Sequence, residues 1–243
     1  MKRFLAALGF LTTVPRPIRD SLGIEELGKA AVWFPLVGAL IGGVVALIQL
    51  GLGRLFSLQI SAVLSTAAWV YLTGGLHLDG LADSYDGLLN SSTPERRLEI
   101  MKDPRLGTFG AVGLILTLAL KIGALSALPL QLAWLVIPLA ASTARWLLLW
   151  SAYQPAARPG GIGALFKQGI KGMDIFIAAI IPLILMALCG WRGLAALLVG
   201  CLCAVGIFRI ARARLSGMTG DILGLMVETV EVVILLTFTA HIQ

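Results

Sequence analysis

The amino-acid sequence predicts an all-α integral membrane protein. Hydrophobic residues make up 58% of its 243 residues and charged residues only 13%, too little charge for a soluble domain of this size. Its apolar runs reach the roughly 20 residues that a helix needs to cross a bilayer. We therefore expect a polytopic bundle of about seven transmembrane helices, which forms a single membrane-embedded domain over residues 1–243.

An N-terminal helix precedes the expected spans. The basic start at Lys2 and Arg3 and the short apolar stretch after it have the outline of a signal peptide, but no convincing cleavage site comes before Pro15. We expect this helix to be retained, either at the membrane interface or packed on the bundle. The boundary between the fifth and sixth spans is soft because only residues 190–193 separate them. The expected spans cover residues 30–52, 59–78, 107–127, 130–152, 173–190, 191–208 and 222–240.

The basic residues predict the orientation, because cytoplasmic loops carry an excess of Lys and Arg. With the acidic cluster placed inside, fifteen of the 19 basic residues fall on the inner side, including Arg16 and Arg19. Arg54 and Arg192 fall outside, and two others lie within spans. All 13 acidic residues lie in the inner loops or the inner halves of spans. The polar chemistry is therefore expected on the cytoplasmic face of the cytoplasmic membrane. The expected cytoplasmic loops lie near residues 87–106, 153–172 and 209–221.

The most informative motif is an acidic cluster at the end of the second apolar segment. Asp79, Asp83 and Asp86 stand at i, i+4 and i+7, so on a helix they share one narrow face. Three like charges this close favour a bound cation, and oxygen ligands at this density suit Mg²⁺ or Mn²⁺ shared with a substrate phosphate. His77, just before the cluster, is either a hydrogen-bonded structural residue or a metal ligand or general base.

A second acidic group opens the last span. Asp221 and Glu228 are two helical turns apart and share a face, and Glu231 lies one turn deeper than Glu228. A carboxylate at that depth is costly and should have a partner, and Arg145 reaches a similar depth. Two interpretations stay open at this point. The group is either a Glu–Arg pair that ties the fourth and seventh spans together, or a second wall of one metal and phosphate site.

The inner loop between the second and third spans mixes acid and base. Thr93 and Pro94 predict the N-cap and first residue of a short amphipathic helix on the membrane surface. Gly107 and Gly110 free backbone amides at the start of the third span, and such amides can hold phosphate. Arg158 lies in a glycine-rich loop. It is either one of the basic residues typical of cytoplasmic loops or a residue that holds the substrate. The stronger candidates for a functional role in this inner loop are Lys102, Asp103 and Arg105.

Several classes of function are excluded by what the sequence lacks. It has no nucleophile elbow, P-loop, zinc-binding Cys/His spacing or nucleic-acid module. Cys189, Cys201 and Cys203 read as small buried hydrophobic residues. The net charge of +6 has two possible explanations. It comes from the basic cytoplasmic loops that set the topology and contact anionic lipid, or part of it binds a polyanionic substrate. Of the remaining chemistries, two acidic walls beside inner-loop arginines fit metal-assisted phosphoryl transfer best.

These motifs resemble those of the cobalamin synthase family, the adenosylcobinamide-GDP ribazoletransferases that complete vitamin B12 assembly. The resemblance covers nearly the whole chain, with three specific motifs in order at family-like spacing. The sequence departs from the family pattern at Met218, where the family usually has glycine. This difference bears on the local backbone geometry. The segments that carry the resemblance are residues 10–15, 34–38, 74–87, 99–110 and 219–224, together with Glu228.

The resemblance implies a Mg²⁺-dependent membrane enzyme that joins adenosylcobinamide-GDP to α-ribazole or its 5′-phosphate. The products would be adenosylcobalamin or its 5′-phosphate, and GMP. For this reaction the catalytic candidates are His77, Asp79, Asp83, Asp86 and Asp221. The expected metal ligands are Asp79, Asp83, Asp86, Asp221 and Glu228. The expected substrate-binding residues are Lys102, Asp103, Arg105, Arg145, Arg158 and Thr219.

The main alternative is a cation-coupled secondary transporter with an acidic site that faces the cytoplasm, since buried acids and glycine-broken helices suit one. The crowding of the acids on one face and the lack of a visible inverted repeat speak against it. A second alternative is a structural subunit whose acids bind lipid headgroups through cations. The acidic spacing also resembles that of CDP-alcohol phosphotransferases, whose signature is not intact here. Membrane lipid is an expected partner, nucleic acid is not, and the oligomeric state, including a homo-oligomer, stays open.

Overall fold

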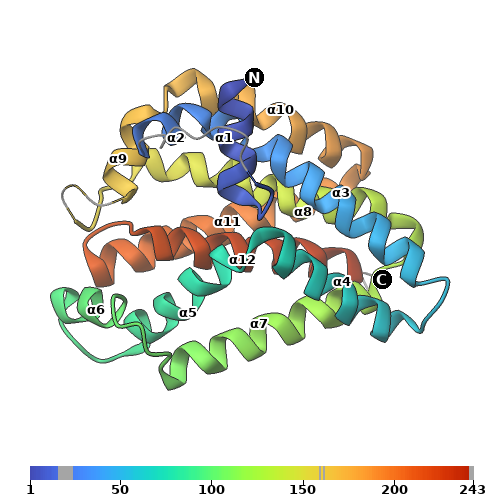
Figure 1. Cartoon of the computed structure of the whole chain (residues 1–243), viewed down its shortest axis with the longest axis horizontal. Coiled ribbons are helices and arrows are strands. Elements are labelled where there is room, and N and C mark those ends of the chain that lie inside the picture. The colour runs from blue at the N-terminus through green and yellow to red at the C-terminus, as the bar shows by residue number, and fades with distance from the viewer. Residues whose placement is uncertain (16–23, 159, 161, 241–243) are drawn as a thin grey trace.

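The computed structural model describes residues 1–15, 24–158, 160 and 162–240, and it confirms the all-α membrane fold class (Figure 1). Within these residues the regular structure is helical, with three short 3₁₀ segments and one isolated β-bridge. The α-helices are α1 (Lys2–Leu11), α2 (Ile24–Ala30), α3 (Phe34–Leu52), α4 (Leu58–Thr73), α5 (Leu76–Leu89), α6 (Pro94–Ile100), α7 (Thr108–Ala127), α8 (Ala133–Leu148), α9 (Ile162–Gly169), α10 (Gly172–Leu188), α11 (Gly190–Leu215) and α12 (Gly220–Thr239).

Five helical stretches of the described chain are long and apolar enough to cross a membrane, and α4 and α10 are shorter apolar helices. Two predicted boundaries were wrong. The second expected span, 59–78, is too long because α4 ends at Thr73, where Gly74 and Gly75 take φ values of 63° and 68°. Left-handed backbone of this kind breaks a helix and favours glycine. The sixth expected span, 191–208, is too short because α11 continues to Leu215.

Helices α8 and α12 form the centre of the bundle, and α12 contacts α5, α7, α8 and α11 (Figure 1). α3 runs along α8 at very close range. A Cβ added at Gly38 would lie 2.5 Å from the Ala141 carbonyl oxygen, and one added at Gly42 would lie 2.6 Å from the Cα of Pro138. Small residues at a crossing let helices approach closely in lipid, where packing rather than the hydrophobic effect holds them together.

The N-terminal helix α1 packs on the bundle, the second of its two expected positions. Its Ala6, Ala7 and Leu11 are buried, and it contacts α2 and α3. The Phe4 ring meets Trp33 edge to face, with ring centroids 5.8 Å apart. The positions of Arg16 and Arg19, which enter the orientation count, lie outside the described residues.

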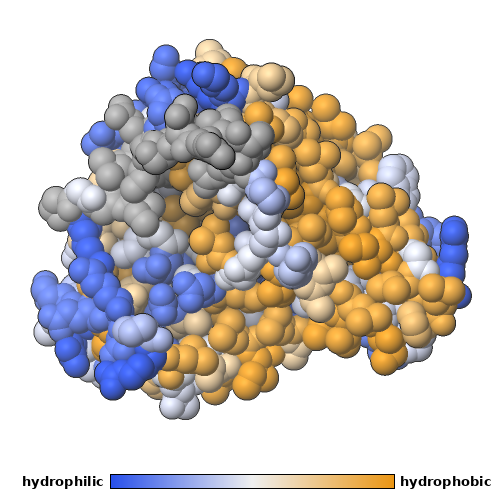
Figure 2. Space-filling model, in the orientation of Figure 1, coloured by the Kyte–Doolittle hydropathy of each residue, from blue (hydrophilic) through white to orange (hydrophobic). Residues whose placement is uncertain are grey.

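The surface of the bundle is divided by polarity. Figure 2 shows hydrophobic residues over most of the visible body, most hydrophilic residues on the side that carries α6 and the N-terminus, and a smaller hydrophilic group at the opposite edge. The connections from α5 to α7 and from α11 to α12 lie at the end that carries α6 (Figure 1). We call it the polar end. The short helix predicted after Thr93 is confirmed as α6, which buries no residue and whose N-terminus is capped by the Thr93 side chain. Its position on the membrane surface stays a prediction.

Candidate active site

The crossing of α5 and α12 brings the two acidic motifs together. A Cβ at Gly80 would lie 2.9 Å from the Asp221 Cα, and one at Gly224 would lie 2.8 Å from the His77 carbonyl oxygen. Real Cβ atoms do not tolerate such distances, so the two helices cross this closely only because both positions are glycine. The first turn of α12, with Asp221, therefore lies against the first turns of α5.

The predicted acidic face is confirmed as one side of helix α5. The part of this face near the start of α5 lies beside Asp221. Asp79 is exposed and Asp83 is half-buried. The pKa of Asp83 rises from 3.8 to about 6, first because of burial and then because of the charges of Asp221, Asp79 and Asp86, in that order. Among these charges, that of Asp221 in the other acidic motif affects Asp83 most. A site with this much negative charge is suited to a cation.

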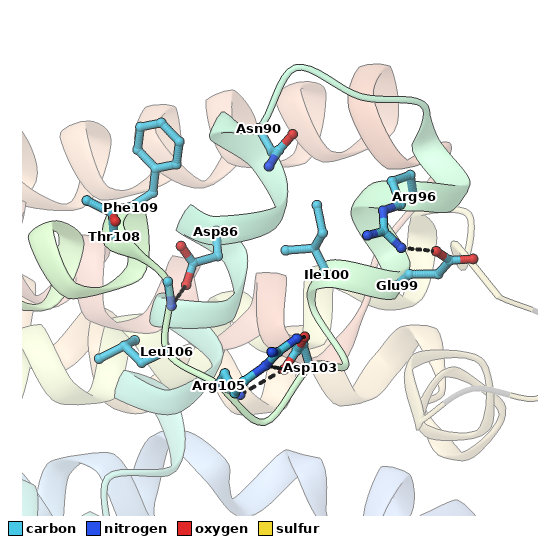
Figure 3. Close-up of a pocket in the computed structure, with 11 residues that line it drawn as sticks. Asp86, Asn90, Arg96, Glu99, Ile100, Asp103, Arg105, Leu106, Thr108 and Phe109 are labelled. Carbon is cyan, nitrogen blue, oxygen red and sulfur yellow. Dashed lines mark hydrogen bonds and ion pairs between the residues drawn. The ribbon is translucent and has the colours of Figure 1, made fainter.

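Asp86 has a different surrounding from its two neighbours. Its Oδ2 accepts a hydrogen bond of 2.8 Å from the Gly107 amide (Figure 3). Its Oδ1 accepts one of 2.8 Å from the Gly110 amide. The glycine amides expected to hold phosphate therefore hold a side-chain carboxylate. This contact satisfies free amides at the start of α7 and favours a negative charge there.

A cavity of about 910 Å³ lies beside Asp79 and Asp83 and is bounded by the Lys102–Leu106 loop. Arg105 donates to Asp103 through Nε at 2.9 Å and through Nη2 at 2.6 Å. These bonds lower the pKa of Asp103 to about 2, so the pair stays ionised. The Arg105 side chain is still 87% exposed, which leaves donors for an anion.

A second cavity, of about 410 Å³, lies on the other side of the same loop (Figure 3). Asp103, Arg105 and Leu106 line both cavities. Arg96 and Glu99 form an exposed ion pair of 2.7 Å at its rim. Figure 3 shows Asp86 and the Asp103–Arg105 pair around this one cavity, on the inner side of the loop that leads into α7.

A third cavity, of about 190 Å³, is mostly apolar and also reaches Asp79. Asp221 and His77 belong to its wall, and Asp83 does not. His77 is 5% exposed, and its Nδ1 has no hydrogen-bond partner among the described residues. Asp79 thus lines both the large cavity and this small, mostly apolar one. We call the large one the polar cavity because its wall also carries Asp83, Lys102, Asp103 and Arg105.

The loop that carries Arg158 is held against the start of α12. Ala157 donates to the Met218 carbonyl at 3.0 Å, and Met218 donates to the Pro155 carbonyl at 2.8 Å. Met218 sits in extended backbone with its side chain buried, so this departure from the family pattern is accommodated. Arg158 donates to the Leu98 carbonyl and is near enough to Asp221 to interact with its charge.

Thr219 is the N-cap of α12, and its Oγ1 accepts from the Ile222 amide at 3.2 Å. The hydroxyl also lies within hydrogen-bonding reach of the Asp221 carboxylate. This capping role accounts for a threonine at this position without any substrate. Its assignment to substrate binding stays a prediction.

The deep carboxylates form a buried network away from the cavities. Lys121 donates at 2.6 Å to Glu228 and at 2.6 Å to Glu231, and Arg145 donates to the other oxygen of Glu231. Lys121 also lies 4.6 Å from the Trp69 ring centroid. Two acids and two bases balance in charge, as buried ions must. These contacts favour the interpretation in which the group ties the spans together, and the roles of Glu228 and Arg145 at the metal and substrate stay predictions.

Sequence reasoning did not identify Lys121 as the partner of both glutamates. Its position in the middle of an apolar span was the available signal, because an ionised residue at that depth implies a partner. The amide contacts of Asp86 had no sequence signal beyond the glycines at 107 and 110.

The carboxylates suit Mg²⁺ better than a metal held by protein alone. In the part of the chain that the structure describes, no three His, Cys, Asp or Glu side chains converge closely enough to bind one ion. Mg²⁺ typically keeps several waters and takes one or two carboxylates plus substrate phosphates. Asp79 and Asp83, one helical turn apart beside the polar cavity, offer such a partial set.

The fold and site together define a class of protein. The chain is a multi-pass α-helical membrane protein whose polar end holds clustered carboxylates beside exposed cations, an arrangement typical of phosphoryl-transfer enzymes. The chain belongs to the cobalamin-5-phosphate synthase family, whose model matches residues 3–239.

Relatives with the name adenosylcobinamide-GDP ribazoletransferase align over nearly the full chain. The Pseudomonas syringae pv. syringae protein is 39% identical, with 98% of each chain covered. The Roseiflexus sp. protein is 36% identical over 96% of this chain and 87% of the relative. The Escherichia coli O17:K52:H18 protein is 36% identical over 97% and 98%. No solved structure matches the chain significantly.

Proposed function

We propose that this protein catalyses the last step of cobalamin synthesis, the transfer of the phosphocobinamide group from adenosylcobinamide-GDP to α-ribazole or its 5′-phosphate. Family membership and full-length relatives of that name support the reaction. The single structural observation that carries it is the α5–α12 crossing, which puts Asp79 and Asp83 beside Asp221 and next to Lys102 and Arg105.

In this reaction a ribose hydroxyl attacks the phosphorus attached to cobinamide. A new P–O bond forms, and the bond from this phosphorus to the bridging oxygen breaks, so that GMP leaves with the electron pair. We assign Asp221 as the group that accepts the hydroxyl proton, because it lies at the crossing and has the Thr219 hydroxyl close by. The positive charge of Arg158 lies near enough to favour the ionised form of this carboxylate.

The polar cavity would take the diphosphate of the donor. Lys102 and Arg105 supply positive charge at its mouth, and the Asp103–Arg105 ion pair fixes the direction of the guanidinium. These cations offset the charge that develops on the leaving GMP. Asp86 acts indirectly in this assignment, because its contacts with the Gly107 and Gly110 amides anchor the loop and the start of α7.

Mg²⁺ is the metal that the site would require, and Asp79 and Asp83 are the residues that would hold it. When bound, the ion would neutralise the diphosphate and stabilise charge on the oxygens at the reacting phosphorus. This assignment gives Asp86 and Glu228 structural roles instead of the metal-binding roles expected from the sequence.

We assign the protein to the cytoplasmic membrane with its polar end toward the cytoplasm. The support is the excess of basic residues in the loops of that end, which is the pattern of cytoplasmic loops. Soluble, anionic substrates would then reach the site without crossing the bilayer.

The test is the release of GMP by purified, detergent-solubilised protein given adenosylcobinamide-GDP and α-ribazole, with Mg²⁺ or with EDTA. Mg²⁺-dependent GMP that appears together with cobalamin supports both the reaction and the metal. GMP formation that persists in EDTA would remove the metal from the proposal. Folded protein that forms no GMP would remove the reaction itself and make cation flux in proteoliposomes the next measurement.

A further inference from the structure

The apolar cavity at the α5–α12 crossing has the properties of a binding site for a flat aromatic group. Its apolar wall includes Phe10, Leu27 and Phe34, from three N-terminal helices. Phe10 and Phe34 are stacked, with ring centroids 5.8 Å apart and an angle of 15° between their planes. Parallel aromatic rings form a flat wall against which another ring can pack in an offset stack.

The polar groups of this cavity gather at one end. Asp79, Asp221 and His77 line it, and the rest of the wall is largely apolar. His77 brings a nearly buried imidazole whose Nδ1 is unpaired among the described residues. The Nδ1 atom itself exposes less than 1 Å², so the polar contacts that this wall offers to a ligand are those of Asp79 and Asp221. An apolar slot with a few convergent polar groups is the common form of a small-molecule site.

The relation between the cavities carries the assignment. Asp79 lines both the polar cavity and the apolar one, whereas Asp83, Lys102 and Arg105 line only the former and Asp221 only the latter. In phosphoryl transfer the attacking and leaving oxygens lie on opposite sides of the phosphorus. A phosphorus held near Asp79 therefore has its leaving group on the cation-rich side and its attacking group on the Asp221 side.

We propose that the apolar cavity is the acceptor subsite, which binds the aromatic base of the ribazole-type alcohol and presents its ribose hydroxyl to Asp221. This inference rests on the proposed function and adds to it the place and chemistry of the second substrate. The base lies against the stacked Phe10 and Phe34 rings, and the polar end with Asp79 and Asp221 receives the ribose.

The cavity's size and polarity favour this occupant over the other reactants. A volume of about 190 Å³ suits a bicyclic ring rather than a corrin macrocycle. A guanine nucleotide would bring phosphates into a wall that, among the residues the structure describes, carries two carboxylates and no cation. A neutral aromatic base avoids that repulsion and gains from burial of its apolar surface.

Two substitutions narrow the apolar cavity without touching its polar end. Leu27→Trp fills it from α2, and Leu223→Phe fills it from α12 as a smaller change. Leu106→Trp is the matched control, because Leu106 lines the polar cavity and is 58% exposed. Thermal unfolding of each purified variant checks folding, and Leu223→Phe serves if Leu27→Trp does not fold.

The measurement is the KM of the full chain for each substrate, together with calorimetric binding of α-ribazole alone. Leu27→Trp and Leu223→Phe should raise the KM for α-ribazole about tenfold or more and change that for adenosylcobinamide-GDP less than about twofold. Leu106→Trp should raise the KM for adenosylcobinamide-GDP and leave the KM for α-ribazole nearly unchanged. Weaker α-ribazole binding in the first two variants should accompany the KM change.

The outcomes separate this inference from the proposed reaction. The acceptor subsite would be overturned, and the reaction would stand, if the KM for α-ribazole were unchanged in both cavity variants. A KM for α-ribazole that rises in Leu106→Trp instead would have the same meaning. A co-purified lipid chain that stays in the cavity during turnover would also overturn it. Wild-type protein that binds α-ribazole in a Leu27-dependent way but releases no GMP would support the subsite and refute the reaction.

Discussion

The carboxylates of this protein differ in their surroundings although the sequence presents them as similar. Asp79, Asp83 and Asp221 meet at cavities where a cation and a phosphate have room. Asp86 is bound by two backbone amides. Glu231, deep in α12, has two cationic partners. Each surrounding predicts a different response to substitution.

The paired substitutions Asp221→Asn and Asp86→Asn test these roles. Asp221→Asn should lower kcat by roughly 10²- to 10⁴-fold, because an amide cannot accept the hydroxyl proton, and should leave thermal stability near that of the wild type. Asp86→Asn should instead lower the stability by about 1–3 kcal/mol, because an amide oxygen cannot satisfy both amides of the α7 start. A fully active Asp221→Asn protein would rule out its role as the base.

The pH dependence of Mg²⁺ binding follows from Asp83. Its pKa rises from 3.8 to about 6 on folding, so the metal-free folded protein holds an extra proton between those values. This group therefore makes the metal-free fold less stable as pH rises from about 4 to about 6. Mg²⁺ must displace the proton, so its affinity should fall by up to about tenfold per pH unit below pH 6.

A Mg²⁺ titration of the melting temperature between about pH 5 and pH 7 measures this effect. Asp83→Asn removes the titrating group and should flatten the pH dependence along with weakening the metal. An unchanged pH slope in that variant would show that another group controls binding.

The buried network predicts a strong stability effect at Lys121. Lys121→Met leaves Glu228 and Glu231 with one cation between them, which should cost about 3–5 kcal/mol because a buried charge loses its compensation. Adding Glu228→Gln should recover part of the loss by restoring the charge balance. The exposed Lys2→Met is the control and should have little effect on thermal unfolding. Equal melting temperatures for Lys121→Met and the wild type would contradict the ion pairs.

At the scale of elements, the α5–α12 crossing determines the site. Gly80 and Gly224 allow two helices far apart in the sequence to touch backbone to backbone. Gly74 and Gly75 end α4 and redirect the chain, so that α5 begins at the angle that this crossing needs. The glycines act on the chemistry only through the positions of the carboxylates.

Gly80→Ala tests the crossing. The new Cβ would lie 2.9 Å from the Asp221 Cα, so the helices must separate, at a cost of about 1–3 kcal/mol and with loss of activity. Gly206→Ala in α11 is the matched control, because a Cβ there meets nothing within 4 Å, and it should be neutral or slightly stabilising. Thermal unfolding and GMP release are the two measurements. Normal activity in a stable Gly80→Ala protein would argue against the crossing as the source of the geometry.

At the scale of the whole molecule, the polar end gathers the loops that carry the cations we propose for substrate binding. This arrangement predicts which residues are accessible from each side of the membrane. In a variant without the three native cysteines, Arg105→Cys should react with an impermeant thiol reagent only from the cytoplasmic side, and Arg54→Cys only from the opposite side. Labelling of oriented vesicles measures this, and the reverse pattern would invert the proposed orientation.

The sequence by itself determined the membrane class, the helical face of Asp79, Asp83 and Asp86, and the short helix after Thr93. These features depend on local composition and helical periodicity, which a single sequence displays. The tertiary structure alone decided that α4 stops at Thr73 and that Gly107 and Gly110 bind Asp86 in place of phosphate. It alone also decided that Lys121 neutralises Glu228. These are contacts between distant segments, and they depend on the approach of helices that no local pattern specifies.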